Sequence, residues 1–90
     1  MLTKTLTVVN PSGFHLRPAG VLCNKAGMFH CRITFAHEGE STQANAKSVL
    51  SVLAACVKCG DVITLTCDGE DEEEAMETVS GAILSGLGEE

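Results

Sequence analysis

Residues 2–27 read LTKTLTVVNPSGFHLRPAGVLCNKAG, and the spacing of the apolar residues changes within this stretch. At first the apolar positions alternate with threonines, which is the period of a β-strand. The turn-forming residues at 10–13 then interrupt this period. From Leu16 onward the apolar residues recur at helical spacing, Pro18 suits the first turn of a helix, and Gly27 suits its end. The stretch therefore predicts a strand that leads through one turn into a helix.

The rest of the chain repeats these two periods. The predicted elements are strand 2–9, a helix from 16 to 26, strand 30–36, a turn at 38–40, strand 41–44, a helix ending at Gly60, strand 62–67 and a final helix behind the acidic run 70–74. Asn45 or Ser48 is expected to cap the second helix, whose apolar positions are Val49, Leu53, Cys56 and Val57. Each helix has one apolar face and each strand one apolar parity. The pattern predicts an α+β fold, a two-layer sandwich with three helices on one side of a four-stranded sheet, but not the strand order.

Length and composition limit the function classes. The 90 residues suffice for a single domain, 1–90. A net charge of −6 and the lack of Tyr and Trp argue against a nucleic-acid partner. No apolar run is long enough to insert into a membrane, and the N-terminus lacks the pattern of a signal peptide, so we expect a cytoplasmic protein.

The negative charge is unevenly distributed. Residues 1–69 hold all six basic residues and four acidic ones, whereas residues 70–90 hold eight acidic residues and no basic ones. The stretch that carries Arg17, Lys25 and Lys47 is therefore locally basic, as binding of a phosphoryl group requires.

Five cysteines and no secretory signal predict free thiols, of which we expect at least four to be buried. Cys56 and Cys59 form a Cys-x-x-Cys pair at the end of the second helix. A structural zinc site needs a second pair at suitable spacing, and a redox pair of the thioredoxin type opens a helix instead of closing one. A thiol or zinc protein is therefore the less favoured alternative, and no metal or cofactor is expected.

His15 stands where the first turn meets the first helix. A helix N-terminus offers unpaired N–H groups, here those of Leu16 and Arg17, and the positive end of the helix dipole. Arg17 adds a guanidinium suited to phosphoryl oxygens. A neutral imidazole is a nucleophile at neutral pH, so the arrangement suits a residue that accepts a phosphoryl group. The alternative is an ordinary exposed or capping histidine, as we expect of His30 and His37.

The sequence GFHLRPA at 13–19, followed by NAKSVL at 45–50 and CGD at 59–61, resembles the histidine-containing phosphocarrier (HPr) family of the bacterial sugar phosphotransferase system. The resemblance covers essentially the whole chain. It implies an open-faced sandwich of pattern β-α-β-β-α-β-α with an antiparallel sheet of strand order 1-4-2-3. It also implies a phosphocarrier instead of an enzyme. Enzyme I would phosphorylate His15, and the group would pass to the IIA component of a sugar permease.

The same resemblance suggests roles for further residues. Arg17 would steady the phosphoryl group, with Ser12 and the backbone N–H of Leu16 completing its surroundings. Ser48 matches a serine that an ATP-dependent HPr kinase/phosphorylase modifies in many Gram-positive members, which creates a form bound by a catabolite-control transcription regulator. The alternatives are a plain capping serine, or a regulatory paralogue that acts mainly through Ser48.

A relay protein has to meet several partners through one small face, and we expect a monomer that does so around His15. The expected exposed apolar docking surface consists of Phe14, Leu16, Val49, Leu50 and Leu53. Alternatively, Leu50 merely widens the core face of the second helix.

Overall fold

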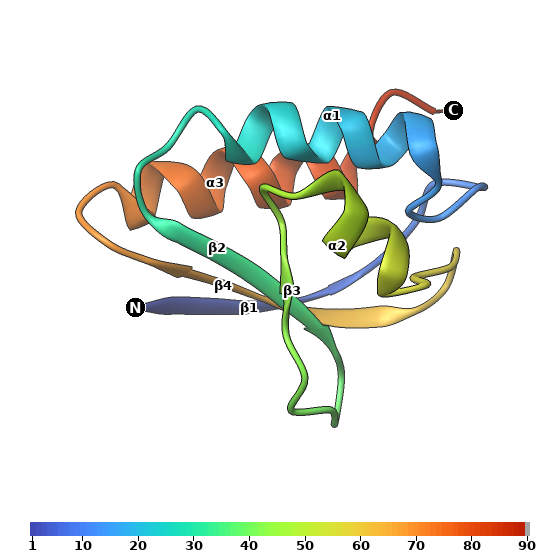
Figure 1. The fold of residues 1–90 in the computed structure, drawn as a ribbon, viewed down its shortest axis with the longest axis horizontal. Helices are drawn as coiled ribbons and strands as arrows, with labels where there is room; N and C mark the ends of the chain where they lie inside the picture. The colour runs from blue at the N-terminus through green and yellow to red at the C-terminus, as the bar shows by residue number, and fades with distance from the viewer. Residues whose placement is uncertain (90) are drawn as a thin grey trace.

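The computed structural model describes residues 1–89, which form four strands and three helices (Figure 1). The elements in chain order are β1 (Leu2–Thr7), α1 (Leu16–Ala26), β2 (Arg32–His37), β3 (Ala44–Asn45), α2 (Val49–Ala54), β4 (Val62–Asp68) and α3 (Glu72–Leu84). This is the predicted order of elements. The predicted α+β class is confirmed.

The sheet is antiparallel throughout, with the order β1-β4-β2-β3. The central strand β4 pairs with β1 from Leu2↔Cys67 to Thr7↔Val62 and with β2 from Arg32↔Asp68 to His37↔Ile63. The hairpin of β2 and β3 was expected from the sequence, whereas the order 1-4-2-3 came from the resemblance. Both are confirmed.

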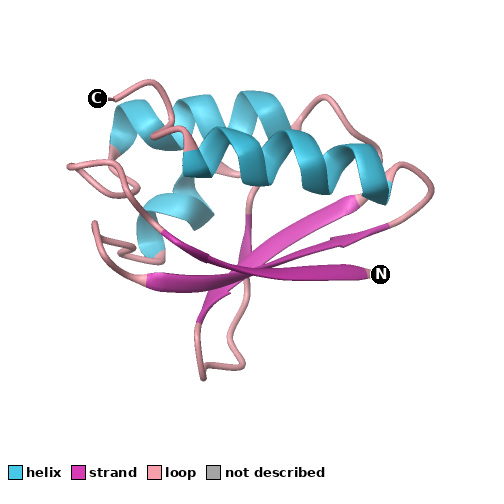
Figure 2. Cartoon of the chain, turned by 180° about the vertical axis from the view of Figure 1, so that it is seen from behind, coloured by secondary structure: helices cyan, strands magenta, loops and turns pink. Residues whose placement is uncertain are grey.

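All three helices cover one face of the sheet, as Figure 2 shows from behind. One parity of each long strand points into the core with the inner helix faces. The largest fully buried side chains of the strands are Phe35, Ile33, Ile63 and Leu65. On the open face, threonines of neighbouring strands lie side by side, Thr3 opposite Thr66 and Thr5 opposite Thr64. The period of two predicted both faces correctly.

The second helix is shorter than predicted. It begins after Ser48 but ends at Ala54, because Cys56 takes a left-handed conformation with φ 54° that leaves the helix. Val57, expected on the helix, is instead buried in the following loop, where its carbonyl accepts the N–H of Phe14 at 2.9 Å. The predicted third strand at 41–44 is also reduced, since only Ala44–Asn45 pairs with β2.

Two exposed thiols contradict the expectation for the cysteines. Cys31 and Cys67 are buried and Cys23 is half-buried, but Cys56 and Cys59 are exposed in the loop after α2. The prediction of at least four buried cysteines was wrong, because α2 ends at Ala54 and the loop after it leaves both Cys56 and Cys59 exposed. Within residues 1–89, no group of three or more His, Cys, Asp or Glu side chains is placed to hold a metal ion. No helix in that range is long and apolar enough to span a bilayer.

Candidate functional site

The turn before α1 is held rigidly in place. The N–H of Gly13 donates to the carbonyl of Asn10 at 3.1 Å. Gly13 has φ 65°, and a Cβ there would lie 2.4 Å from the carbonyl oxygen of Val57, so both its conformation and its surroundings require glycine. The next residue, Phe14, is bonded to Val57 as described above. His15 therefore follows a segment fixed to the loop that connects α2 and β4.

His15 is the N-cap residue of α1, and its exposed ring makes no capping hydrogen bond. The helical bonds begin with the N–H of Ala19, which donates to the carbonyl of His15 at 2.8 Å. Pro18 has no N–H, and the N–H groups of Leu16 and Arg17 precede the first helical bond. The donors predicted beside His15 are therefore available at the positive end of the helix dipole.

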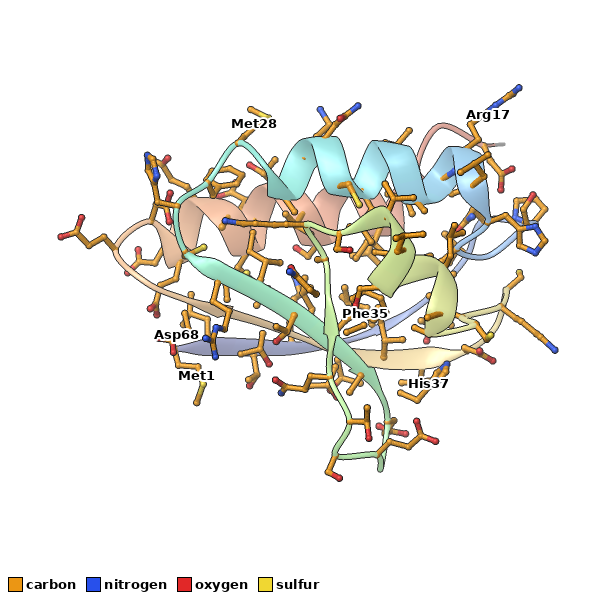
Figure 3. All side chains as sticks on the ribbon, viewed as in Figure 1. Met1, Arg17, Met28, Phe35, His37 and Asp68 are labelled. Atoms are coloured by element: carbon orange, nitrogen blue, oxygen red, sulfur yellow. The ribbon has the colours of Figure 1, made fainter. Side chains whose placement is uncertain are left out.

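Arg17 is exposed, and Figure 3 shows its side chain projecting from the start of α1 into solvent. Hydrogen bonds from Ser12 and Asn10 lower the pKa of Glu89, and the charge of Arg17 adds the smallest contribution. His15, Leu16 and Arg17 thus stand at the start of α1, and Ser12 lies in the turn that precedes them.

Ser12 has a partner that the sequence did not suggest. Its hydroxyl donates to Oε2 of Glu89 at 2.6 Å, and its backbone N–H donates to Oε1 of Glu89 at 3.1 Å. The buried Asn10 adds a third bond, from Nδ2 to Oε1 of Glu89 at 3.0 Å, and the same amide donates to the carbonyl of Gly13 at 2.6 Å. The Glu89 carboxylate therefore lies on Ser12, one of the groups expected to surround a phosphoryl group. These hydrogen bonds, those of Ser12 foremost, lower the pKa of Glu89 and keep it ionised.

The end of α3 directs Glu89 to this position. The N–H of Gly86 donates to the carbonyl of Ile83 at 3.1 Å, and that of Leu87 donates to the carbonyl of Ala82 at 3.0 Å. This pair of bonds is a Schellman motif, which requires the positive φ of 93° that Gly86 adopts. Leu87 is then buried in the core. The Gly86 signal was present in the sequence, but the contact with Ser12 was not.

The expected docking residues divide into three groups. Phe14 is only 2% exposed and packs edge-on against Phe35 with ring centroids 5.3 Å apart, so its predicted exposure was wrong. Leu16 and Leu50 are 69% and 80% exposed, which excludes a core role for Leu50. Val49 and Leu53 are half-buried.

A hollow of about 250 Å³ lies directly beside His15. Its lining consists of Phe14, His15, Leu16, Leu53, Cys56, Val57 and Lys58. Two predicted docking residues therefore adjoin His15 at this hollow and reach the surface: Leu16, which is exposed, and Leu53, which is half-buried.

Ser48 is the N-cap of α2, as one of the two predicted alternatives. Its Oγ accepts the N–H of Ser51 at 3.2 Å, and its side chain is half-buried. Asn45, the other candidate, accepts the N–H of Lys47 through Oδ1 at 2.9 Å. Ser48 thus opens the second helix and His15 opens the first.

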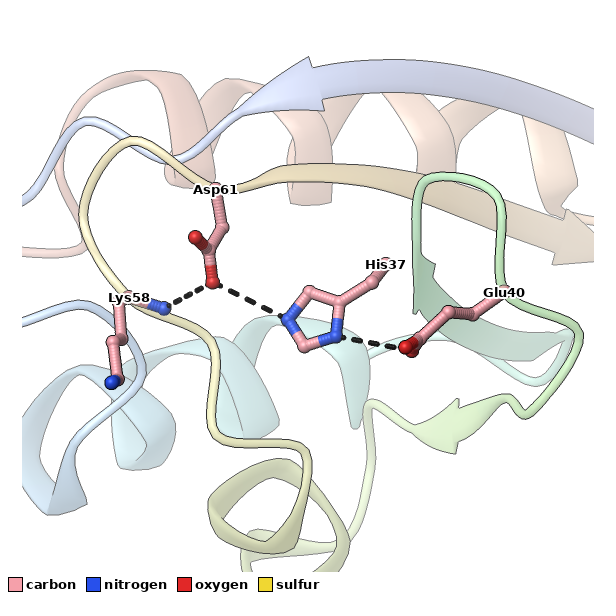
Figure 4. A network of polar contacts seen from close by, with 4 residues as sticks. All are labelled: His37, Glu40, Lys58 and Asp61. Atoms are coloured by element: carbon pink, nitrogen blue, oxygen red, sulfur yellow. Dashed lines mark hydrogen bonds and ion pairs between the residues drawn. The ribbon is translucent and has the colours of Figure 1, made fainter.

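The other two histidines lie on other parts of the molecule. His37 lies between two carboxylates, with Nδ1 3.3 Å from Oε2 of Glu40 and Nε2 3.4 Å from Oδ2 of Asp61 (Figure 4). The same Oδ2 accepts the backbone N–H of Lys58 at 2.9 Å, so this cluster joins the β2–β3 hairpin to the loop before β4. His30 is exposed, and its backbone N–H donates to Oδ2 of Asp71 at 2.7 Å.

Residues 2–84 match the family model described as "PTS HPr component phosphorylation site". The chain belongs to the HPr family. It is 34% identical to the phosphocarrier protein HPr of Cupriavidus necator, over 99% of this chain and 98% of that protein. It is 37% identical to the multiphosphoryl transfer protein of Salmonella typhimurium over 99% of this chain, but it spans only 24% of that protein's length.

Solved HPr structures have the same fold. The structure of HPr from Thermoanaerobacter tengcongensis has a TM-score of 0.91 at 33% identity, covering 100% of this chain and 99% of that one. A dimer of Crh, the catabolite repression protein of Bacillus subtilis, has a TM-score of 0.74 at 28% identity, covering 94% and 95% of the two chains. The fold implied by the resemblance is therefore confirmed.

Proposed function

We propose that this chain is a phosphocarrier of the phosphotransferase system, which takes a phosphoryl group from Enzyme I on His15 and passes it to the IIA component of a sugar permease. The observation that carries the proposal is the exposed ring of His15 at the N-terminus of α1, beside the N–H groups of Leu16 and Arg17. Membership of the HPr family supports the same function.

The chemistry requires few groups. The unprotonated nitrogen of the His15 ring attacks phosphorus, and an N–P bond forms as the bond between phosphorus and the donor breaks, with the electron pair leaving on the donor. The helix N-terminus and the guanidinium of Arg17 stabilise the negative oxygens of the bound group. Transfer to the acceptor reverses these steps, and His15 is regenerated.

Incubation with phosphoenolpyruvate and Enzyme I tests this function. We expect one acid-labile phosphoryl group per chain by mass spectrometry, and none on His15→Ala. His30→Ala removes an exposed histidine elsewhere and is the matched control, which should label like the wild type. An unlabelled wild-type chain, or equal labelling of His15→Ala, would contradict the proposal.

Regulation at Ser48 is a second candidate function. Leu50, two residues beyond Ser48, is an exposed apolar side chain that favours a docking surface beside the hydroxyl. A phosphate there adds charge of about −1.5 to −2 at a helix start. In this scheme an HPr kinase/phosphorylase modifies Ser48 and a catabolite-control transcription regulator binds the product. The retained His15 favours a carrier over a paralogue that acts through Ser48 alone.

ATP and the kinase/phosphorylase test the second function. We expect an acid-stable phosphate that disappears in Ser48→Ala and persists in Ser51→Ala. Labelling that survives Ser48→Ala would assign the modification to another residue.

A further inference from the structure

Glu89 occupies Ser12, one of the groups assigned to the phosphoryl group. Both oxygens of its carboxylate accept bonds from Ser12, and one of them also accepts from Asn10. The Ser12 hydroxyl carries a single proton, so it cannot donate to Glu89 and to a phosphoryl oxygen at the same time. Any role of this hydroxyl toward a phosphoryl group on His15 begins with release of Glu89.

The segment that carries Glu89 is anchored by its own backbone bonds and by a buried partner. Gly86 and Leu87 close the Schellman motif, Leu87 is 1% exposed, and the N–H of Glu89 donates to the carbonyl of Gly86 at 2.9 Å. Asn10, which donates a hydrogen bond to the Glu89 carboxylate, is also 1% exposed. The carboxylate is therefore held at the site by a segment that packs on the core through Leu87 and by the buried Asn10.

The charges at the site oppose one another. The Glu89 carboxylate is held on Ser12, and a phosphoryl group on His15 would bring a second anion to the same helix terminus. Two anions beside one hydroxyl donor repel each other. The carboxylate thus disfavours the phosphorylated state relative to the free state.

We propose that Glu89 is an internal anion that competes with the phosphoryl group on His15 for the hydroxyl of Ser12. This competition raises the phosphoryl-transfer potential of the phosphorylated protein. The inference rests on the proposed phosphocarrier function. No covalent change is involved, since only the hydrogen bond of Ser12 is exchanged between two acceptors. Glu89 acts as a positioning residue through Ser12.

The variant Glu89→Gln tests the competition. At equilibrium with phosphoenolpyruvate, pyruvate and Enzyme I, we expect the ratio of phosphorylated to free protein to rise about threefold, the order of an exposed charge interaction. Glu73→Gln makes the same charge change on an exposed residue at the opposite end of α3 and is the matched control. It should give the wild-type ratio within about 1.5-fold, the remainder expected of weak, screened charges. An unchanged ratio in Glu89→Gln would overturn the inference.

A double-mutant cycle separates competition for Ser12 from a general charge effect. In a Ser12→Ala background, the hydroxyl that the two anions share is gone. We expect Glu89→Gln to have less than half of its effect there. An undiminished effect would show that Glu89 acts without Ser12 and would overturn the proposed competition.

A reaction without Enzyme I distinguishes failure of the inference from failure of the proposed function. Phosphoramidate transfers its phosphoryl group to the imidazole nitrogen, the P–N bond of the reagent breaks, and ammonia leaves. Hydrolysis of the resulting phosphohistidine is then followed by NMR at neutral pH. We expect it to be slower in Glu89→Gln than in the wild type and in Glu73→Gln. Equal hydrolysis rates in the three proteins would contradict the inference, whether or not Enzyme I phosphorylates the chain.

Discussion

Exposure separates two neighbouring apolar residues that the sequence treats alike. Phe14 and Leu16 flank His15, yet Phe14 packs on Phe35 in the core and Leu16 stands in solvent. The reason is the bond from Phe14 to Val57, which turns this side chain inward before the helix begins. Such a bond joins segments far apart in the chain, so a local pattern does not contain it. Phe14 therefore supports the site from inside.

Leu50 and Phe14 should respond differently to substitution. Leu50→Glu changes an exposed side chain, so we expect a change in the free energy of unfolding within about 0.5 kcal/mol and a severalfold slower transfer from Enzyme I. Phe14→Ala should instead cost about 3–5 kcal/mol, because it empties a buried space. Thermal unfolding and rapid-quench labelling measure the two effects.

Met28→Glu is the control for Leu50→Glu, since Met28 is a 66% exposed side chain at the far end of α1 from His15 (Figure 3). It should leave both stability and transfer nearly unchanged. A fall in stability of Leu50→Glu beyond 1 kcal/mol, a core-like loss, would contradict the docking role.

At the scale of elements, Asp71 connects α3 to the start of β2. Its carboxylate accepts the N–H groups of His30 at 2.7 Å and Cys31 at 2.9 Å. These bonds, that of His30 foremost, lower the pKa of Asp71 in the folded protein. The stabilisation is therefore present above the unfolded pKa of about 3.9 and is lost as the pH falls through the lower folded value.

Asp71→Asn should consequently destabilise the protein at pH 7 and matter less in acid. We expect the difference in unfolding free energy from the wild type to shrink steadily below about pH 4. Urea denaturation at pH 7, 4 and 2.5 measures it. Glu74→Gln, one turn further along α3, is the control. A difference that stays constant across this range would show that the carboxylate charge does not matter.

The sequence predicted the elements well where one periodic pattern decided the structure. The strands around Leu6 and Leu65 and the helix around Leu22 follow their apolar periods. The end of α2 was wrong because the pattern continues through Val57, while a tertiary hydrogen bond draws that residue out of the helix. His15 and its helix terminus were predictable from local residues. Glu89 was not, since 77 positions separate it from Ser12.

On the scale of the whole molecule, the layers divide the thiols into two classes. Burial raises the pKa of Cys31 to about 11, and burial also raises the pKa of Cys67 and Cys23. The thiolate is the reactive form, so these three react slowly at pH 8. Cys56 and Cys59 lie outside the core in the exposed loop.

Titration with a coloured disulfide reagent at pH 8 should therefore show two fast thiols and three slow ones. We expect the slow three to react at the fast rate only after unfolding in guanidinium. Cys56→Ser with Cys59→Ser should remove the fast phase and retain the slow one. Five thiols of equal rate in the folded protein would contradict the layer arrangement.

The open face of the sheet also has a practical consequence. Its paired threonines lie on the side away from the helices, whereas His15 opens α1 in the helical layer (Figure 2). A linker attached at Thr5 would hold the protein on a sensor surface with the start of α1 turned outward. With the protein immobilised in that way, donor and acceptor proteins can be passed one after the other over the same layer of molecules. Each phosphoryl transfer can then be measured in turn.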